Sequence, residues 1–200
     1  MPITFNCQIK GCIEFLAINN RVAKLSKSLR KIEKTREAIA ILNEANKILP
    51  GNIKVLTELG VCNLRIKEFM TAREWLYKAL EIVPEDTVAH NTIGQTFLAE
   101  GNFSAAREWF LTTLKIDPKN TVAHNSIGQT YLTEGNFSAA IEEFHKALKI
   151  DPRDLVAHNS IGQTYLAAGN NIAARKWFLK TLKIDPEDEV AKILLARVFF

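Results

Sequence analysis

Two kinds of amide side chain recur at fixed positions and are the first candidates for binding chemistry. An asparagine and a glutamine stand four residues apart in three places: Asn91 and Gln95, Asn125 and Gln129, Asn159 and Gln163. Residues four apart share one face of a helix. A primary amide both donates and accepts hydrogen bonds. Columns of such amides could pair with the N–H and C=O groups of an extended peptide, largely independently of the peptide's sequence.

Three recurring histidines, His90, His124 and His158, raise the question of a metal site. If each lies on a separate helix, their backbones are separated by at least about 8–10 Å, the distance between packed helices. Zn–N bonds are only about 2.0 Å long, so three imidazoles cannot converge easily. Packing between helices is the favoured interpretation, and we predict no metal site and no cofactor.

Motifs that would indicate catalysis are absent from the sequence. It contains no Gly-Lys-Ser/Thr phosphate loop, no Gly-x-Ser-x-Gly elbow and no His-Glu-x-x-His pair. We therefore predict that the chain is not an enzyme. The repeat region of a larger regulatory protein or enzyme stays open as an alternative.

The segments that carry these residues are near copies of one another. Each is 34 residues long, and about two thirds of the positions match between neighbours. A constant period of this length marks a stacked architecture in which neighbouring units bury a continuous core. The predicted divisions are an N-terminal segment (1–18), a degenerate repeat (19–52), a divergent repeat (53–86), three near-identical repeats (87–188) and a C-terminal capping half-repeat (189–200).

Each repeat is predicted to form two helices joined by a short turn. In 121–154, apolar residues recur with the helical period in two runs, and Gly135 between them is a helix-stop signal. Ser138 is the candidate N-cap of the second helix, which Pro152 ends. In the preceding copy the helices are expected over 88–100 and 104–116.

Gly128 in the middle copy lies inside the first helix, where glycine lowers helix stability, so we expect a packing contact that offsets this loss. Glycine there is less favourable than alanine by about 1 kcal/mol. Close approach of the second helix, at the small side chain of Ala140, is the expected reason.

This frame resembles the tetratricopeptide repeat family. The resemblance is carried by His124, Ile127, Gly128, Tyr131, Ala140, Phe144, Ala147 and Pro152, and by their equivalents in the neighbouring copies. It implies an all-α tetratricopeptide-repeat superhelix, or α-solenoid, of about five antiparallel helix pairs and a C-terminal capping helix. It also implies a protein–protein interaction scaffold whose concave groove holds an extended peptide segment of another protein.

The resemblance further implies which residues line that groove. The expected lining is Asn91, Gln95, Leu98, Asn125, Gln129, Leu132, Asn159, Gln163 and Leu166. Some family members bind a C-terminal carboxylate through a clamp of lysine, arginine and asparagine. The candidates for such a basic end of the groove are Lys27, Arg30, Lys31, Lys54 and Arg65. The alternative is that the copied residues reflect duplication alone, with no ligand.

The charge and the cysteines limit the class of binding partner and the cellular compartment that we expect. The net charge is +4, and residues 1–52 hold an excess of basic residues. A nucleic-acid surface would need a larger face with interleaved aromatic residues, so no nucleic-acid partner is predicted. Three cysteines without a metal-ligand pattern indicate a reducing, cytoplasmic location. Neither a signal peptide nor an apolar stretch of about 18 residues is present, so membrane insertion is not expected.

The C-terminal half-repeat suggests a second hypothesis, a self-associating assembly protein. A terminal repeat normally needs a polar outer face, whereas 189–200 is rich in apolar residues and ends in Phe199 and Phe200. Its helix is expected to pack on the preceding one through Val190, Ile193 and Leu194. Surplus apolar surface at either terminus would then support a homo-oligomer.

Overall fold

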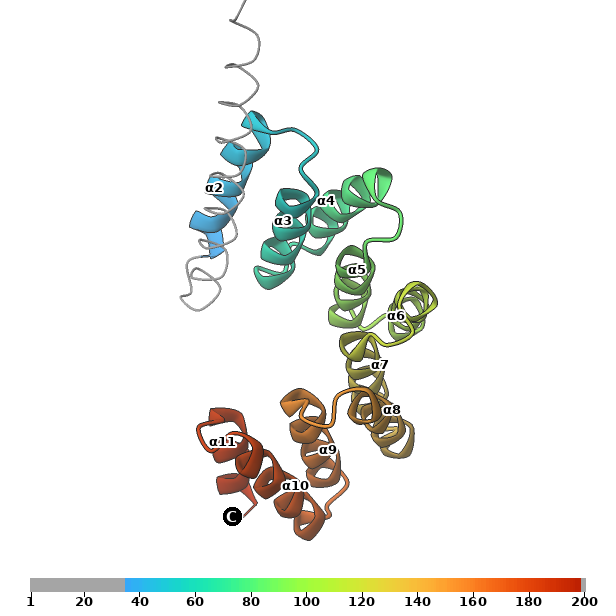
Figure 1. The fold of residues 1–200 in the computed structure, drawn as a ribbon, viewed down its shortest axis with the longest axis vertical. Helices are drawn as coiled ribbons and strands as arrows, with labels where there is room; N and C mark the ends of the chain where they lie inside the picture. The colour runs from blue at the N-terminus through green and yellow to red at the C-terminus, as the bar shows by residue number, and fades with distance from the viewer. Residues whose placement is uncertain (1–34, 199–200) are drawn as a thin grey trace, which may run out of the picture. The chain divides into compact units, whose positions relative to one another are not determined.

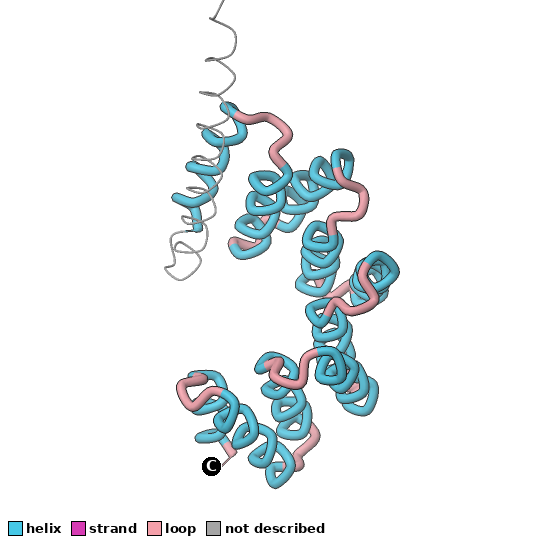
Figure 2. Tube along the Cα trace, in the orientation of Figure 1, coloured by secondary structure: helices cyan, strands magenta, loops and turns pink. Residues whose placement is uncertain are grey.

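The computed structural model describes residues 35–198, which form ten α-helices and no β-strand (Figure 1). The helices are α2 (Thr35–Ile48), α3 (Ile53–Arg65), α4 (Phe69–Ile82), α5 (Thr87–Ala99), α6 (Phe103–Ile116), α7 (Thr121–Thr133), α8 (Phe137–Ile150), α9 (Leu155–Ala167), α10 (Asn171–Ile184) and α11 (Glu189–Arg197). Short loops join them (Figure 2). The predicted all-α repeat fold is confirmed.

Two compact units make up the chain, the first ending at Thr96 and the second beginning at Phe97, within α5. In the second unit α7 packs on α8 and α9 on α10, and each pair also contacts the next. The first helices α5, α7, α9 and α11 begin 34 residues apart. The helices expected over 88–100 and 104–116 are observed at Thr87–Ala99 and Phe103–Ile116.

Buried clusters join the second helix of one pair to the first helix of the next. Phe144 and Ala147 of α8 pack with Ala157 and Ile161 of α9, all fully buried. The same arrangement places Phe110 of α6 against Ile127 of α7, and Phe178 of α10 against Leu194 of α11. The core therefore lies between repeats, and a single helix pair cannot complete it.

The glycine inside the first helix allows this phenylalanine to enter. A Cβ atom on Gly128 would lie 2.6 Å from Cε1 of Phe144. Gly162 faces the Phe178 ring in the same way, and Gly60 faces Leu76 in the first unit. The second helix does contact the glycine, but through the large ring of Phe144, so the prediction that the small side chain of Ala140 makes this contact is wrong.

Helix starts are capped by amide and carboxylate side chains. Asn120 and Asp154 cap α7 and α9. Ser138 is not the N-cap of α8, because the helix begins two residues earlier than an N-cap at Ser138 would place it. Asn136 holds the cap position and accepts from the backbone N–H of Ala139 at 3.2 Å, and the Ser138 hydroxyl donates to the same Asn136 oxygen.

The C-terminal helix packs inward by a narrower stripe than expected. Ala191 and Leu194 are its buried residues, and they join the cluster around Phe178. Val190 and Ile193 are 48% and 56% exposed, so the prediction that they pack on α10 is wrong. Each precedes an inward-facing residue by one position, which turns its side chain roughly 100° away around the helix. Phe199 and Phe200 lie outside the described residues.

Among residues 35–198, no helix combines the length and the apolar character needed to cross a membrane.

The turn between paired helices requires a left-handed backbone, and one repeat supplies it without glycine. Gly101, Gly135 and Gly169 have φ of 80°, 78° and 76°. Lys67 stands at the equivalent place in the first unit with φ 64°. A side chain there is unfavourable by about 1–2 kcal/mol because Cβ crowds the following carbonyl.

We predict that Lys67→Gly stabilises the protein by about 0.5–1 kcal/mol, since relief of this crowding outweighs the greater freedom of glycine in the unfolded chain. Urea denaturation followed by circular dichroism measures the change. Lys67→Ala is the matched control, because it removes the charge and keeps Cβ. An equal gain from both variants would contradict the backbone explanation.

Candidate functional site

In the second unit the first helices lie beside one another and present a common face. α7 contacts α9, and α9 contacts α11. Val122, Val156 and Val190 stand at equivalent positions on these helices and are 53%, 60% and 48% exposed. We call these three residues the valine column. It is an apolar surface that the described residues leave open to solvent.

Two glutamines share the face of the valine column. Gln129 and Gln163 follow Val122 and Val156 by seven residues, two helical turns, and both are half-buried. Among residues 35–198, neither side-chain amide has a hydrogen-bond partner. Their donors and acceptors therefore remain available for a ligand. Gln95 is also half-buried, on the part of α5 that belongs to the first unit.

The predicted leucines are divided between surface and core. Leu132 is half-buried and packs against the cluster of Phe144 and Ile161. Leu166 is half-buried against the cluster of Phe178 and Leu194, and Leu98 packs against that of Phe110. Each therefore supports the inter-repeat core and offers only part of its side chain to a ligand.

All three predicted asparagines are buried, and two of them make contacts between repeats. Nδ2 of Asn125 donates to Oδ2 of Asp154 at 2.7 Å, and Nδ2 of Asn159 donates to Oδ1 of Asp188 at 3.0 Å. The Oδ1 atoms of both asparagines, and of Asn91, are buried without a hydrogen-bond partner. One amide N–H of Asn125 and one of Asn159 therefore bind the aspartate that caps the next first helix. Contact of these asparagines with a peptide stays a prediction.

The candidate basic residues do not form one cluster in the described chain. Lys54 and Arg65 lie at opposite ends of α3, roughly 16 Å apart along its axis by the helical rise per residue. Both are exposed. Lys27, Arg30 and Lys31 lie outside the described residues. A two-residue cationic clamp is therefore not assembled by Lys54 and Arg65 alone.

Each recurring histidine has a packing role. Nε2 of His158 lies 3.1 Å from the carbonyl oxygen of Pro152, and its ring lies 5.3 Å from that of Trp177. His90 contacts the Pro84 carbonyl at 2.8 Å in the same way. His124 instead pairs with Glu143, which occupies the place of Trp177, at 2.9 Å. Residues 35–198 contain no group of three side chains that could hold a metal ion.

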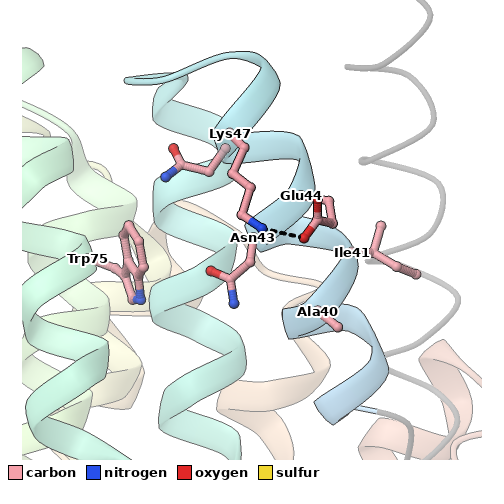
Figure 3. Close-up of a pocket in the computed structure, with 7 residues that line it drawn as sticks. Ala40, Ile41, Asn43, Glu44, Lys47 and Trp75 are labelled. Carbon is pink, nitrogen blue, oxygen red and sulfur yellow. Dashed lines mark hydrogen bonds and ion pairs between the residues drawn. The ribbon is translucent and has the colours of Figure 1, made fainter.

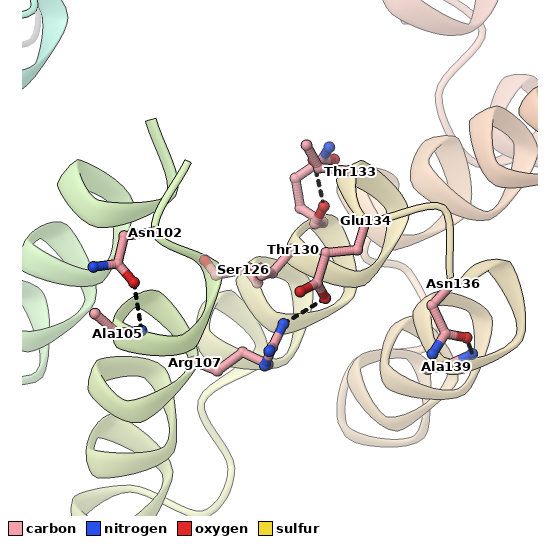
Figure 4. A network of polar contacts seen from close by, with 10 residues as sticks. Asn102, Ala105, Arg107, Ser126, Thr130, Thr133, Glu134, Asn136 and Ala139 are labelled. Atoms are coloured by element: carbon pink, nitrogen blue, oxygen red, sulfur yellow. Dashed lines mark hydrogen bonds and ion pairs between the residues drawn. The ribbon is translucent and has the colours of Figure 1, made fainter. Parts of the chain in front are cut away.

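A polar network ties α6 to α7 (Figure 4). The Arg107 guanidinium donates to Glu134 at the end of α7 and lies 5.2 Å from the Tyr131 ring centroid. The hydrogen bond to Glu134 raises the pKa of Arg107 further above its ordinary value. The network joins neighbouring repeats.

A hollow of about 670 Å³ lies in the first unit, between α2 and Trp75 of α4 (Figure 3). Its lining includes two amides, Asn43 and Asn46, and the pair Glu44–Lys47, whose charged atoms are 2.7 Å apart. The opposite charges of this pair neutralise each other. Sequence patterns do not reveal this hollow, because its residues belong to a weak repeat and share no motif.

The comparison with known sequences finds a repeat signature. Two sequence profiles described as tetratricopeptide repeat match residues 88–120 and 131–198. The search of curated proteins found no match.

Solved structures show the same fold. A thermophilic TPR protein of Thermus thermophilus superposes with a TM-score of 0.82 at 17% identity, over 90% of this chain and 98% of that chain. MamA gives 0.60 at 24% identity, over 81% and 95%. YrrB, described as a TPR protein with an unusual peptide-binding site, gives 0.56 at 18% identity, over 86% and 89%.

We predict that Asn159→Ala lowers the free energy of unfolding by about 1.5 kcal/mol, because a hydrogen bond to a carboxylate is lost from a buried position. Thermal or urea denaturation measures the loss. Asn171→Ala, at an exposed residue of α10, is the matched control and should change stability by less than about 0.5 kcal/mol. Equal stability of Asn159→Ala and the parent would show that the Asn159–Asp188 contact contributes nothing.

Proposed function

The chain belongs to the tetratricopeptide-repeat family, and on that premise we propose that it is a non-enzymatic scaffold that holds an extended peptide of a partner protein. The repeat fold implies a protein–protein interaction scaffold. The finer proposal concerns where the peptide lies, namely along the first helices α7, α9 and α11.

The observation that carries this proposal is the joint exposure of the valine column and two unpaired glutamine amides. Val122 and Val156 expose apolar surface that has no partner among the described residues. Gln129 and Gln163 provide both donors and acceptors on the same face. Apolar side chains and a peptide backbone are the groups that this combination matches.

The spacing suits an extended chain. Neighbouring packed helices lie about 8–10 Å apart, and an extended peptide rises about 3.3 Å per residue. About three peptide residues would therefore pass each repeat, enough for one backbone contact to a glutamine and one side chain against a valine. YrrB, which shares the fold, is described as having a peptide-binding site, and this supports the proposal by analogy.

The proposed location is the cytoplasm. Three cysteines without a metal-ligand spacing suit a reducing compartment.

A second candidate, self-association, is favoured by the exposed Val190 and Ile193 on α11. These residues lie on the last described helix, where a second copy could continue the apolar face. If this candidate is correct, static light scattering should report a molar mass that rises with protein concentration, and Ile193→Ser should reduce the rise. A constant monomer mass would exclude it.

The peptide proposal is tested by first isolating the partner with a pull-down from native lysate and mapping the bound peptide. We predict that Gln129→Ala with Gln163→Ala weakens the binding of that peptide roughly ten-fold, since each lost hydrogen bond contributes about 0.5–1.5 kcal/mol. Val122→Ser with Val156→Ser should weaken it by a similar factor. Fluorescence anisotropy measures the affinities.

Leu111→Ser is the matched control, because Leu111 is equally exposed but lies on the second helix α6. It should leave the affinity unchanged. If Leu111→Ser weakens binding while the valine and glutamine variants do not, the peptide lies on the second helices and the proposal is wrong.

A further inference from the structure

The second helix of the last complete pair, α10, has a charge that its counterparts lack. Four equivalent positions can be compared across the near-identical repeats: Glu108, Leu111, Thr112 and Lys115 in α6; Glu142, His145, Lys146 and Lys149 in α8; Lys176, Leu179, Lys180 and Lys183 in α10. Taking histidine as neutral, the formal charge at these positions is 0 in α6, +1 in α8 and +3 in α10. The excess is specific to α10, since the three repeats otherwise share most of their sequence.

The four residues of α10 form one surface. Their spacing of three, four and seven residues places them on one helical face. Together with Leu182 they line an open hollow of about 430 Å³. Leu179 is 41% exposed, and the three lysines are exposed around it. We call Lys176, Leu179, Lys180 and Lys183 the basic face of α10.

The lysines of the basic face have no carboxylate partner among the described residues. In α8, Lys146 pairs with Glu142 at 3.1 Å and Glu143 at 2.6 Å. The equivalent positions in α10 hold Lys176 and Trp177, so both carboxylates are lost. Lys180 instead lies 3.8 Å from the centroid of the Trp177 ring.

Helix stability explains only part of this charge. A lysine in the last turn recurs in α6, α8 and α10, where it complements the helix dipole. That accounts for Lys183. Lys176 stands in the middle of the helix, four residues before Lys180, and like charges at that spacing destabilise a helix. Its presence therefore lacks an intrahelical reason.

The surroundings of the basic face are electropositive as well. His145 of α8 contacts the Trp177 ring, with centroids 5.6 Å apart. Burial lowers the pKa of His145 first, and the charges of Lys180, Lys149 and His158 lower it further. The cationic region thus extends from α10 to α8.

We propose that the basic face of α10 docks an acidic segment of a protein partner that also presents an apolar side chain. Carboxylates would neutralise the lysines and relieve their mutual repulsion. The apolar side chain would enter the hollow over Leu179 and Leu182. A phosphate backbone would need a larger basic face with exposed aromatic residues for stacking, whereas Trp177 is half-buried under Lys180. This surface is separate from the first-helix face of the proposed function, and different variants test the two.

The test uses the full chain and a fluorescent peptide of repeated Glu-Glu-Leu units, with binding followed by anisotropy. Lys176→Glu should weaken binding roughly five-fold, the size expected for loss and reversal of exposed charge pairs. It restores the residue type found at Glu108 and Glu142, so the helix should fold normally. Lys119→Glu, with the same change in net charge in the turn between α6 and α7, should have less than about a two-fold effect.

Two further measurements keep the proposal falsifiable. Glu142→Lys in α8 should strengthen binding, because it places a lysine at the position of Lys176. In the parent protein, saturation with the acidic peptide should raise the pKa of His145, measured by NMR titration. Equal effects of Lys176→Glu and Lys119→Glu would overturn the proposal. Tighter binding of single-stranded DNA or of phosphatidylserine vesicles than of the peptide would overturn it too.

Discussion

The interaction on which this structure depends is the burial of one large side chain per repeat between neighbouring helix pairs. Phe110, Phe144 and Phe178 are fully buried, each against the first helix of the next pair. Burying a phenylalanine contributes about 1.5–3 kcal/mol. A single helix pair covers only part of the ring, and the first helix of the next pair completes the burial. The same ring also contacts the glycine in the first helix of its own pair, as Phe144 of α8 does with Gly128 of α7, and any Cβ there would overlap the ring.

This constraint explains how much of the fold the sequence reveals. Because each repeat buries an equivalent large side chain, the apolar pattern recurs every 34 residues. This recurrence makes the helix boundaries and the stacking predictable from the sequence. The same regularity hides details that depend on single residues. Ser138 and Asn136 are both good N-cap residues, and only the observed start of α8 shows that Asn136 has the role.

The candidate site was harder to predict, for a physical reason. Helical spacing places Asn125 and Gln129 on one face, so the sequence pattern predicts the same ligand-binding role for both amides. The difference comes from Asp154, 29 residues after Asn125, whose carboxylate reaches Asn125 but leaves the Gln129 amide unpaired. Likewise, the hydrophobic residues of α11 could be divided into inward and outward sets only once the position of Phe178 was known. Contacts between repeats are not local in sequence, and the pattern of one repeat does not contain them.

The contact between asparagine and the following capping aspartate has a further consequence, for cooperativity. Asp188 caps α11 through the backbone N–H of Ala191 and at the same time accepts from Asn159 of α9. One carboxylate therefore takes part both in starting a helix and in joining it to its predecessor. In a linear lattice of repeats, this belongs to the coupling between neighbours rather than to either unit alone. The same arrangement recurs at α9, whose capping Asp154 accepts from Asn125 of α7. Loss of one repeat therefore also removes a contact that supports the helix cap of its neighbour, which makes unfolding along the array more cooperative.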